Sequence, residues 1–118
     1  MNNKIYISGP ITGHPDWRER FSNAEVHVSQ PDFFDRYGSA EMSERYGVFR
    51  FNTVSALSYG RDDKSWRWNM RKAVWKMLWC STVYFLRGWN KSRGARIEFR
   101  IAEALGKRII FEEDARCR

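Results

Sequence analysis

The residue with the clearest potential for chemistry is Glu98, which ends the segment SRGARIE (92–98). On a helix that begins near Ala95, steps of three and four residues place Glu98 on one apolar face with Ala95, Ala102 and Leu105. That face should pack on a sheet, so an ionised carboxylate costs free energy unless it is hydrogen-bonded or opens onto a polar cleft. A carboxylate at a cleft could act as a nucleophile. The alternative is that Glu98 sits in the first turn and merely stabilises the helix start.

The residues just before this helix form a candidate anion-binding cradle. Gly94 allows close approach to the backbone, the N–H groups of the helix start point outward, and the Ser92 hydroxyl adds a donor. A phosphate group would fit such a cradle. Arg93 and Arg96 either assist or are solvated surface charges, and the second interpretation is the ordinary one for each.

The elements that must position these residues follow from the hydrophobic pattern. Strands are predicted at 4–8, 48–51, 82–86 and 108–111. Helices are predicted at 15–28, 66–78 and 95–105, and an extended loop at 29–47 contains a short helix at 40–46. Strands that alternate with helices pair in parallel through right-handed crossovers. The sequence therefore predicts an α/β sandwich with a parallel sheet of four to five strands.

In such sheets a ligand binds beyond the carboxyl ends of the strands. Two loops occupy that edge here, SGPITG (8–13) after the first strand and RGWNKSRG (87–94) after the third. The residues expected to contact a ligand are Ser8, Gly9, Pro10, Trp89, Ser92 and Gly94. For Trp89, packing in the core is the alternative, and Trp66 is expected in the core.

Composition limits the possible partners. A chain of 118 residues makes one domain, and its formal charge of +7 attracts anions or serves solubility alone. The chain also has six tryptophans, which raises the possibility of nucleic-acid binding. We rank that function last, because the basic residues are dispersed along the chain and no nucleic-acid motif appears.

The N-terminal segment MNNKIYISGP has no long apolar run, so we expect neither a secretion signal nor a membrane span, and a cytoplasmic location. Cys80 and Cys117 are far apart, and the histidines are limited to His14 and His27. This pattern indicates neither a disulfide framework nor a zinc site. We expect no metal and no cofactor.

Four segments together carry a family resemblance. They are ISGPITG (7–13), MLWCS (77–81), FLRGWNKSRGARIE (85–98) and AEALGKRII (102–110). They resemble the small, often phage-encoded branch of the nucleoside 2-deoxyribosyltransferase-like family, whose relatives include 2'-deoxynucleoside 5'-phosphate N-hydrolases. The resemblance implies one such domain over 1–118 with a flavodoxin-like or Rossmann-like three-layer fold. It also implies a homodimer or larger oligomer.

The same resemblance implies roles for individual residues. Glu98 matches the nucleophile that attacks C1' of deoxyribose, and Tyr6 matches a tyrosine that positions this nucleophile. Ser92 matches the serine that binds the 5'-phosphate in the N-hydrolases, and the Gly9-Pro10 turn would bring backbone close to the substrate. The implied reaction proceeds through a glycosyl-enzyme ester, as in a retaining glycosidase.

Two departures from the family pattern bear on activity. Ala73 and Ser81 stand where relatives carry aspartates, and the first of these helps to protonate the leaving base. Loss of a general acid typically costs about 10²–10⁴-fold in rate. Asp62 and Asp63 are candidate substitutes, although a solvated loop pair is their ordinary interpretation. Two functions therefore stay open. One is an enzyme that cleaves or transfers an N-glycosidic bond, and the other is a silent nucleotide-binding module, which in a phage would interfere with host nucleotide signalling or defence.

Overall fold

A computed structural model of the protein describes residues 2–60 and 63–113, except for the side chains of residues 45 and 46. Within these residues four parallel strands form one sheet in the order β2-β1-β3-β4. The strands are β1 (Lys4–Ser8), β2 (Asn52–Val54), β3 (Thr82–Phe85) and β4 (Arg108–Phe111). The helices are α1 (Trp17–Val28), α2 (Pro31–Tyr37), α3 (Ala40–Tyr46), α4 (Ala56–Tyr59), α5 (Trp66–Leu78) and α6 (Arg93–Ala104), with a 3₁₀ turn η1 (Trp89–Lys91).

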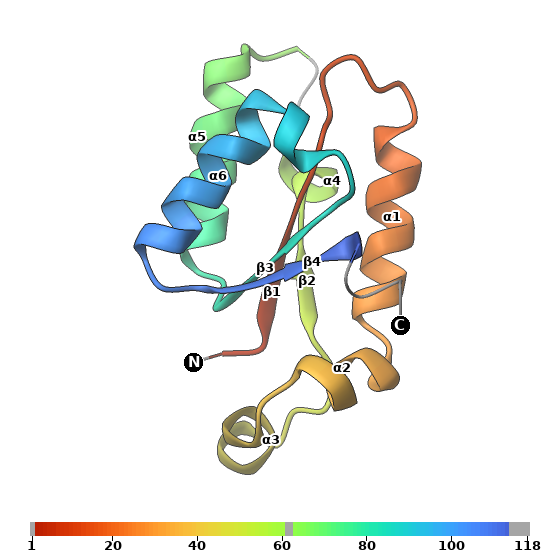
Figure 1. The fold of residues 1–118 in the computed structure, drawn as a ribbon, viewed down its shortest axis with the longest axis vertical. Coiled ribbons are helices and arrows are strands. Elements are labelled where there is room, and N and C mark those ends of the chain that lie inside the picture. The colour runs from red at the N-terminus through yellow and green to blue at the C-terminus, as the bar shows by residue number, and fades with distance from the viewer. Residues whose placement is uncertain (1, 61–62, 114–118) are drawn as a thin grey trace.

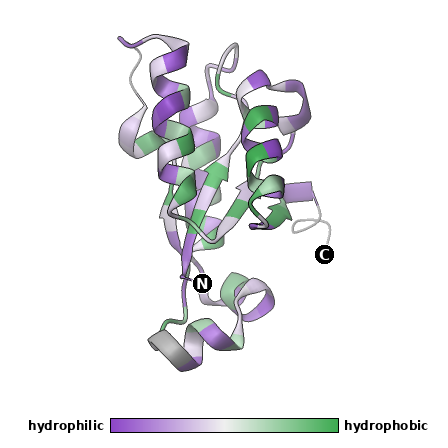
Figure 2. Cartoon of the chain, turned by 90° about the vertical axis from the view of Figure 1, so that its left-hand side faces the viewer, coloured by the Kyte–Doolittle hydropathy of each residue, from purple (hydrophilic) through white to green (hydrophobic). Residues whose placement is uncertain are grey.

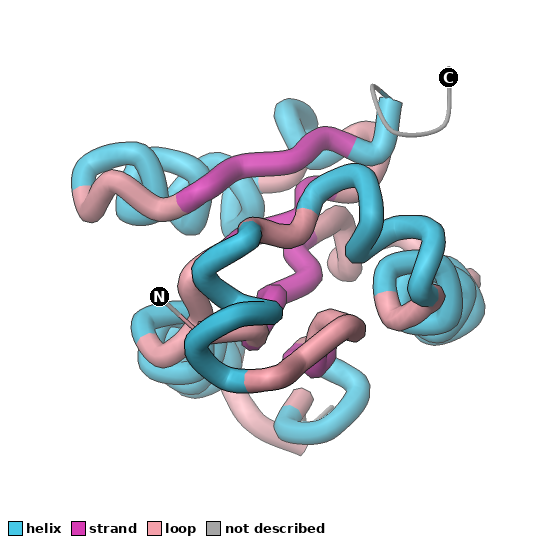
Figure 3. The backbone as a smooth tube through the Cα atoms, turned by 90° about the horizontal axis from the view of Figure 1, so that it is seen from below, coloured by secondary structure: helices cyan, strands magenta, loops and turns pink. Residues whose placement is uncertain are grey.

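The elements form three layers. Helix α1 covers one face of the sheet, and helices α5 and α6 cover the other (Figure 1). Seen from below, the strands lie between helices on both sides (Figure 3). This arrangement confirms the expected α/β three-layer, flavodoxin-like fold, with the lower of the two expected strand numbers.

Alternation along β1 divides the core into two clusters. Ile5 and Ile7 point toward α1 and join one buried cluster, whereas Tyr6 points the other way and joins the cluster under α5 and α6. Successive residues of a strand face opposite sides of the sheet, so Ser8 shares the side of Tyr6. In Figure 2 the strands at the centre of the molecule carry hydrophobic segments, coloured green, beside hydrophilic ones. Strand β1 thus presents two hydroxyl groups to the α5 and α6 side.

The segment expected as an extended loop contains a helix that the pattern did not predict. Helix α2 starts with Pro31 at its N-terminus, and its residues Phe33 and Phe34 are buried against the α1 side of the core. Proline suits the first turn of a helix, and burial of two phenylalanines stabilises it. The short helix expected at 40–46 is confirmed as α3, whose N-cap is Ser39.

The second strand lies later in the chain than predicted. The segment 48–51 is not a strand, and β2 occupies Asn52–Val54, in a stretch expected to be a loop. Phe51 is the last buried residue before the strand, and the Asn52 N–H donates to the Asn3 carbonyl. Pairing with β1 therefore fixes the strand, which the short apolar run alone placed wrongly.

Two helices differ from their predicted limits or faces. Helix α1 begins at Trp17, two residues after Pro15. Helix α5 buries Ala73 and Met77, but Trp66, which was expected in the core, is exposed. Over the part of the chain that the structure describes, no helix is both long enough and apolar enough to cross a bilayer.

Candidate active site

A cleft of about 1070 Å³ opens at the carboxyl edge of the sheet. The loop that follows β1 lines one side, and residues of α1, α4, α5, η1 and the start of α6 line the rest. The expected ligand contacts that line it are Ser8, Gly9, Pro10, Ser92 and Gly94, together with Tyr6 and Glu98. The structure thus brings seven of the eight expected site residues to one cleft, at the edge where α/β sheets bind ligands.

Glu98 lies in the cleft and is 6% exposed. The Ser8 hydroxyl donates to Glu98 Oε1 at 3.3 Å. The other oxygen, Oε2, is buried and has no hydrogen-bond partner among the described residues. A buried carboxylate oxygen without a partner costs free energy, so the arrangement leaves one oxygen of Glu98 available to a bound molecule.

The helix start does not explain Glu98. Helix α6 begins at Arg93, two residues before the predicted start, so Glu98 lies in its second turn. The free N–H groups and the positive end of the dipole are confined to the first turn. The interpretation of Glu98 as a residue that stabilises the helix start is therefore wrong.

Burial raises the pKa of Glu98 to about 7 from an ordinary value of 4.5. Desolvation of the charged form is the largest cause, and hydrogen bonds from Tyr6 and Ser8 act in the opposite direction. Near pH 7 the carboxyl group therefore exists in both forms. A pKa close to the working pH is typical of groups that take part in catalysis.

The site contains a second tyrosine, Tyr59, which the sequence analysis did not identify. Tyr59 of α4 lines the cleft, and its hydroxyl is hydrogen-bonded to the Tyr6 hydroxyl. Burial, followed by the nearby charge of Glu98, raises the pKa of both phenols, so both keep their protons. Tyr6 has one hydroxyl hydrogen, and it donates this hydrogen to Glu98. Tyr59 is therefore the donor in the hydrogen bond between the two tyrosines. Helix α4 is too short to give a periodic signal, which explains why sequence reasoning missed Tyr59.

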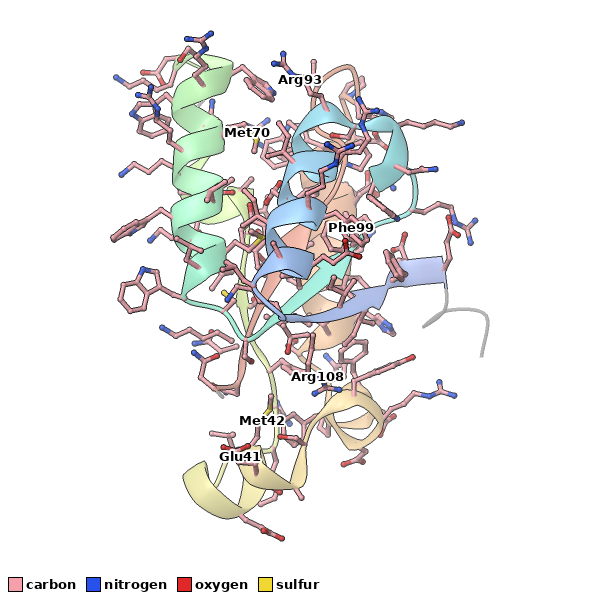
Figure 4. The ribbon with its side chains drawn as sticks, turned by 60° about the vertical axis from the view of Figure 1, so that its left-hand side comes forward. Glu41, Met42, Met70, Arg93, Phe99 and Arg108 are labelled. Carbon is pink, nitrogen blue, oxygen red and sulfur yellow. The ribbon has the colours of Figure 1, made fainter. Side chains whose placement is uncertain are left out.

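The residues of the expected anion cradle lie together at the start of α6 and line the cleft. Ser92 is the N-cap, and its hydroxyl oxygen accepts from the Ala95 N–H at 3.3 Å. A Cβ at Gly94 would lie 3.0 Å from the sulfur of Met70, so this glycine allows α6 to approach α5. In Figure 4, Met70 and Arg93 lie at the same end of these two helices. Gly94 therefore shapes the cleft through helix packing as well as backbone access.

Gly9 and Pro10 form the buried floor of the loop after β1. A Cβ at Gly9 would lie 2.9 Å from Leu86, at the end of the neighbouring strand. Gly88 has φ +88°, a conformation that favours glycine. A Cβ added at Gly88 would lie 3.7 Å from Cγ of Pro10, which is ordinary van der Waals contact. The two loops at this edge are therefore held together by close packing between glycine and apolar side chains.

Positive charge surrounds the cleft. The lining includes Lys64, Lys91 and Arg93, whereas Glu98 is its single carboxylate among the described residues. Trp66 also lines the cleft, is 39% exposed, and has the Arg93 guanidinium 4.5 Å from its ring centre. Trp66 is therefore a rim residue, and the expectation that it packs in the core is wrong. An anionic ligand would be attracted to this rim.

Trp89 is the expected site residue that the structure keeps apart from the cleft lining. Its ring packs on Phe85, Phe99 and Phe111, with ring centres 4.7 to 5.5 Å away. The alternative of core packing describes it better than ligand contact does.

The two positions where the resembled family carries aspartates lie in different places. Ala73 is buried and lines the cleft. Ser81 precedes β3 at the opposite edge of the sheet, where its hydroxyl donates to the Asn2 carbonyl at 2.6 Å. Asp63 is exposed and absent from the lining, and Asp62 lies outside the described residues. Of these positions, Ala73 is therefore the one that belongs to the cleft.

Comparison with known proteins places the chain in a family. The model of the family DUF4406, a domain of unknown function, matches residues 3–111. The chain belongs to this family. No curated protein and no solved structure matches it. DUF4406 membership leaves the activity to be argued from the site, where the described residues contain no group of three His, Cys, Asp or Glu side chains able to hold a metal ion. Cys117 lies outside the described residues.

Proposed function

We propose that this protein binds a nucleotide in the cleft and cleaves its N-glycosidic bond, with Glu98 as the nucleophile. The observation that carries the proposal is the buried Glu98 carboxyl group, with Oε2 unpartnered among the described residues and Ser8 on Oε1. A carboxylate held in this way can stabilise an oxocarbenium-like transition state and then bond to the sugar carbon.

The proposed reaction has two steps. A Glu98 oxygen bonds to C1' while the C1'–N bond breaks, and the base leaves with the bonding electron pair and takes a proton from water. A second water then attacks C1' and gives its proton to the hydroxide left by the first step, while the C1'–O bond to Glu98 breaks and its electron pair returns to the carboxylate. Tyr6 holds the carboxyl group during both steps, and Tyr59 holds Tyr6.

The phosphate of the nucleotide is assigned to the start of α6. Ser92, the first N–H groups of α6 and the nearby charges of Lys91 and Arg93 offer an anion site on one side of the cleft. The loop with Gly9 and Pro10 then faces the sugar. A protein with this activity would work in the cytoplasm, where nucleotides occur, as the homodimer or larger oligomer that the resemblance implies.

The pH dependence of the rate follows from Glu98. The nucleophile is the ionised form, and burial raises the pKa of this group to about 7. The rate should therefore rise with pH through about 7. A bound phosphate adds a negative charge nearby and moves this rise to higher pH.

Free-base release measured by chromatography tests the proposal. Wild type and Glu98→Ala are incubated with deoxynucleoside monophosphates, ribonucleotides, free nucleosides and NAD. Base released by wild type alone supports the proposal and names the substrate class. Release by both proteins would contradict Glu98 as the nucleophile.

A second candidate function is nucleotide binding without turnover. Ala73 favours it, because a methyl group lines the cleft where active relatives of the resembled family carry an acid. Saturable nucleotide binding by folded protein with no base release would identify this function. Ala73→Asp provides the matched test, since it restores a carboxyl group at this point. A gain of about 10²-fold or more in base release would show that only the acid was missing.

A further inference from the structure

The side of α5 that faces away from the sheet combines tryptophans and cations. Positions 68, 75 and 79 lie within about 40° of one another around a helix. Trp75 and Trp79 are 57% and 60% exposed, although tryptophan is usually mostly buried. We call this surface the α5 outer face; it comprises Trp68, Trp75, Trp79, Arg67, Arg71, Lys72 and Lys76. Figure 2 views the molecule from this side.

Aromatic rings and cations alternate along this face. The rings of Trp75 and Trp79 meet edge to face, with centres 6.0 Å apart. The ammonium groups of Lys64 and Lys72 lie 5.9 and 5.5 Å from the centre of the Trp68 ring. The charges are therefore mixed with the rings and are not confined to a separate strip.

The charge of the face has one sign. The α5 sequence WRWNMRKAVWKML contains no aspartate or glutamate, and Arg67, Arg71, Lys72 and Lys76 are all exposed. A two-fold contact between two copies of this face would bring four cations against four, which is unfavourable. A homodimer would therefore use another face of the protein. The partner that this face fits is a polyanion with flat apolar groups.

We propose that the α5 outer face binds single-stranded nucleic acid. Exposed tryptophans can stack on bases, and the interleaved cations can contact the phosphates between them. A duplex keeps its bases stacked inside, so the rings would gain little from it. The proposal is independent of the cleft, because the residues of α5 that line the cleft are Trp66, Asn69, Met70 and Ala73.

The structure supplies what the sequence pattern lacked. Basic residues are dispersed along the chain, and the helical periodicity of 66–78 does not say which of its tryptophans are buried. Only the fold shows that the core side of α5 is narrow, with Ala73 and Met77 buried, and that Trp75 and Trp79 are exposed.

Fluorescence anisotropy with a labelled oligothymidylate, measured over a range of salt concentrations, tests the proposal. Trp75→Ala combined with Trp79→Ala should weaken binding by about tenfold or more. Arg71→Gln combined with Lys72→Gln should reduce the slope of log affinity against log salt by about 1.4, because each single-strand phosphate contact contributes about 0.7.

A matched control removes the same charge elsewhere. Arg36→Gln combined with Arg50→Gln changes two exposed cations distant in the chain from α5 and should leave the slope unchanged. Circular dichroism confirms that each variant is folded. The proposal is overturned by equal affinity for duplex and single strand, or by equal losses in the control. It is also overturned by binding only to phosphatidylserine vesicles, or by self-association that the tryptophan substitutions abolish.

Discussion

Replacing Glu98 by glutamine should stabilise the protein, and more so at high pH. Raising the pKa of the carboxyl group from 4.5 to about 7 corresponds to about 3 kcal/mol of unfavourable ionisation in the folded state. The folded pKa is the higher one, so the folded state binds more protons. Wild-type stability is therefore lost as pH rises from 4.5 to about 7. Glutamine has nearly the same shape and no charge, so Glu98→Gln escapes this cost.

Chemical unfolding in urea at pH 5 and pH 8 measures the effect. At pH 5 Glu98 is protonated in the folded state and largely ionised in the unfolded state, so Glu98→Gln should already be more stable, but by only about 1 kcal/mol. At pH 8 Glu98→Gln should be more stable by up to about 3 kcal/mol, which corresponds to about 10 °C in melting temperature. The comparison between the two proteins cancels the titration of all other groups. A stability difference that stays constant between pH 5 and pH 8 would refute the reasoning from burial.

Three further substitutions test other parts of the site. Tyr59→Phe removes the outer hydroxyl of the tyrosine pair, so the pKa of Glu98 should rise further; carbon-13 NMR of labelled glutamate measures it, and an unchanged pKa would contradict the chain of donors. Gly9→Ala should destabilise the protein by about 1–3 kcal/mol in urea unfolding, because the new Cβ would overlap Leu86. Trp89→Ala should cost up to about 3 kcal/mol of stability and leave nucleotide affinity, measured by calorimetry, intact; weaker binding by folded protein would return Trp89 to the cleft.

The parts of the fold that the sequence predicted correctly are those with strong local patterns. The strand over Lys4–Ser8 alternates and ends at Gly9-Pro10, and the helices over 17–28 and 66–78 repeat their apolar residues at helical intervals. Parallel topology then follows from alternation of strands and helices, and it brings the two expected loops to one edge. The position of Glu98 in a cleft could be predicted on this basis.

The remaining features depend on contacts between distant segments. Helix α2 is stabilised by burial of Phe33 and Phe34 against α1, which local propensity does not register. Strand β2 has three residues, and pairing with β1 sets its position. Tyr59 enters the site at the end of a four-residue helix, and its partner Tyr6 lies 53 residues away in the chain. Whether a tryptophan is buried depends on how many neighbours its helix has, so Trp66 could not be placed from spacing.

The alternation of side chains along β1 lets the two faces of the sheet change independently. Substitutions at Ile5 or Ile7 alter the packing against α1 and so change the free energy of unfolding. Substitutions at Tyr6 or Ser8 alter the groups around Glu98 and leave the packing against α1 untouched. One short strand therefore serves folding with one side and the site with the other. In relatives that bind a different ligand, positions 6 and 8 should vary while positions 5 and 7 stay apolar.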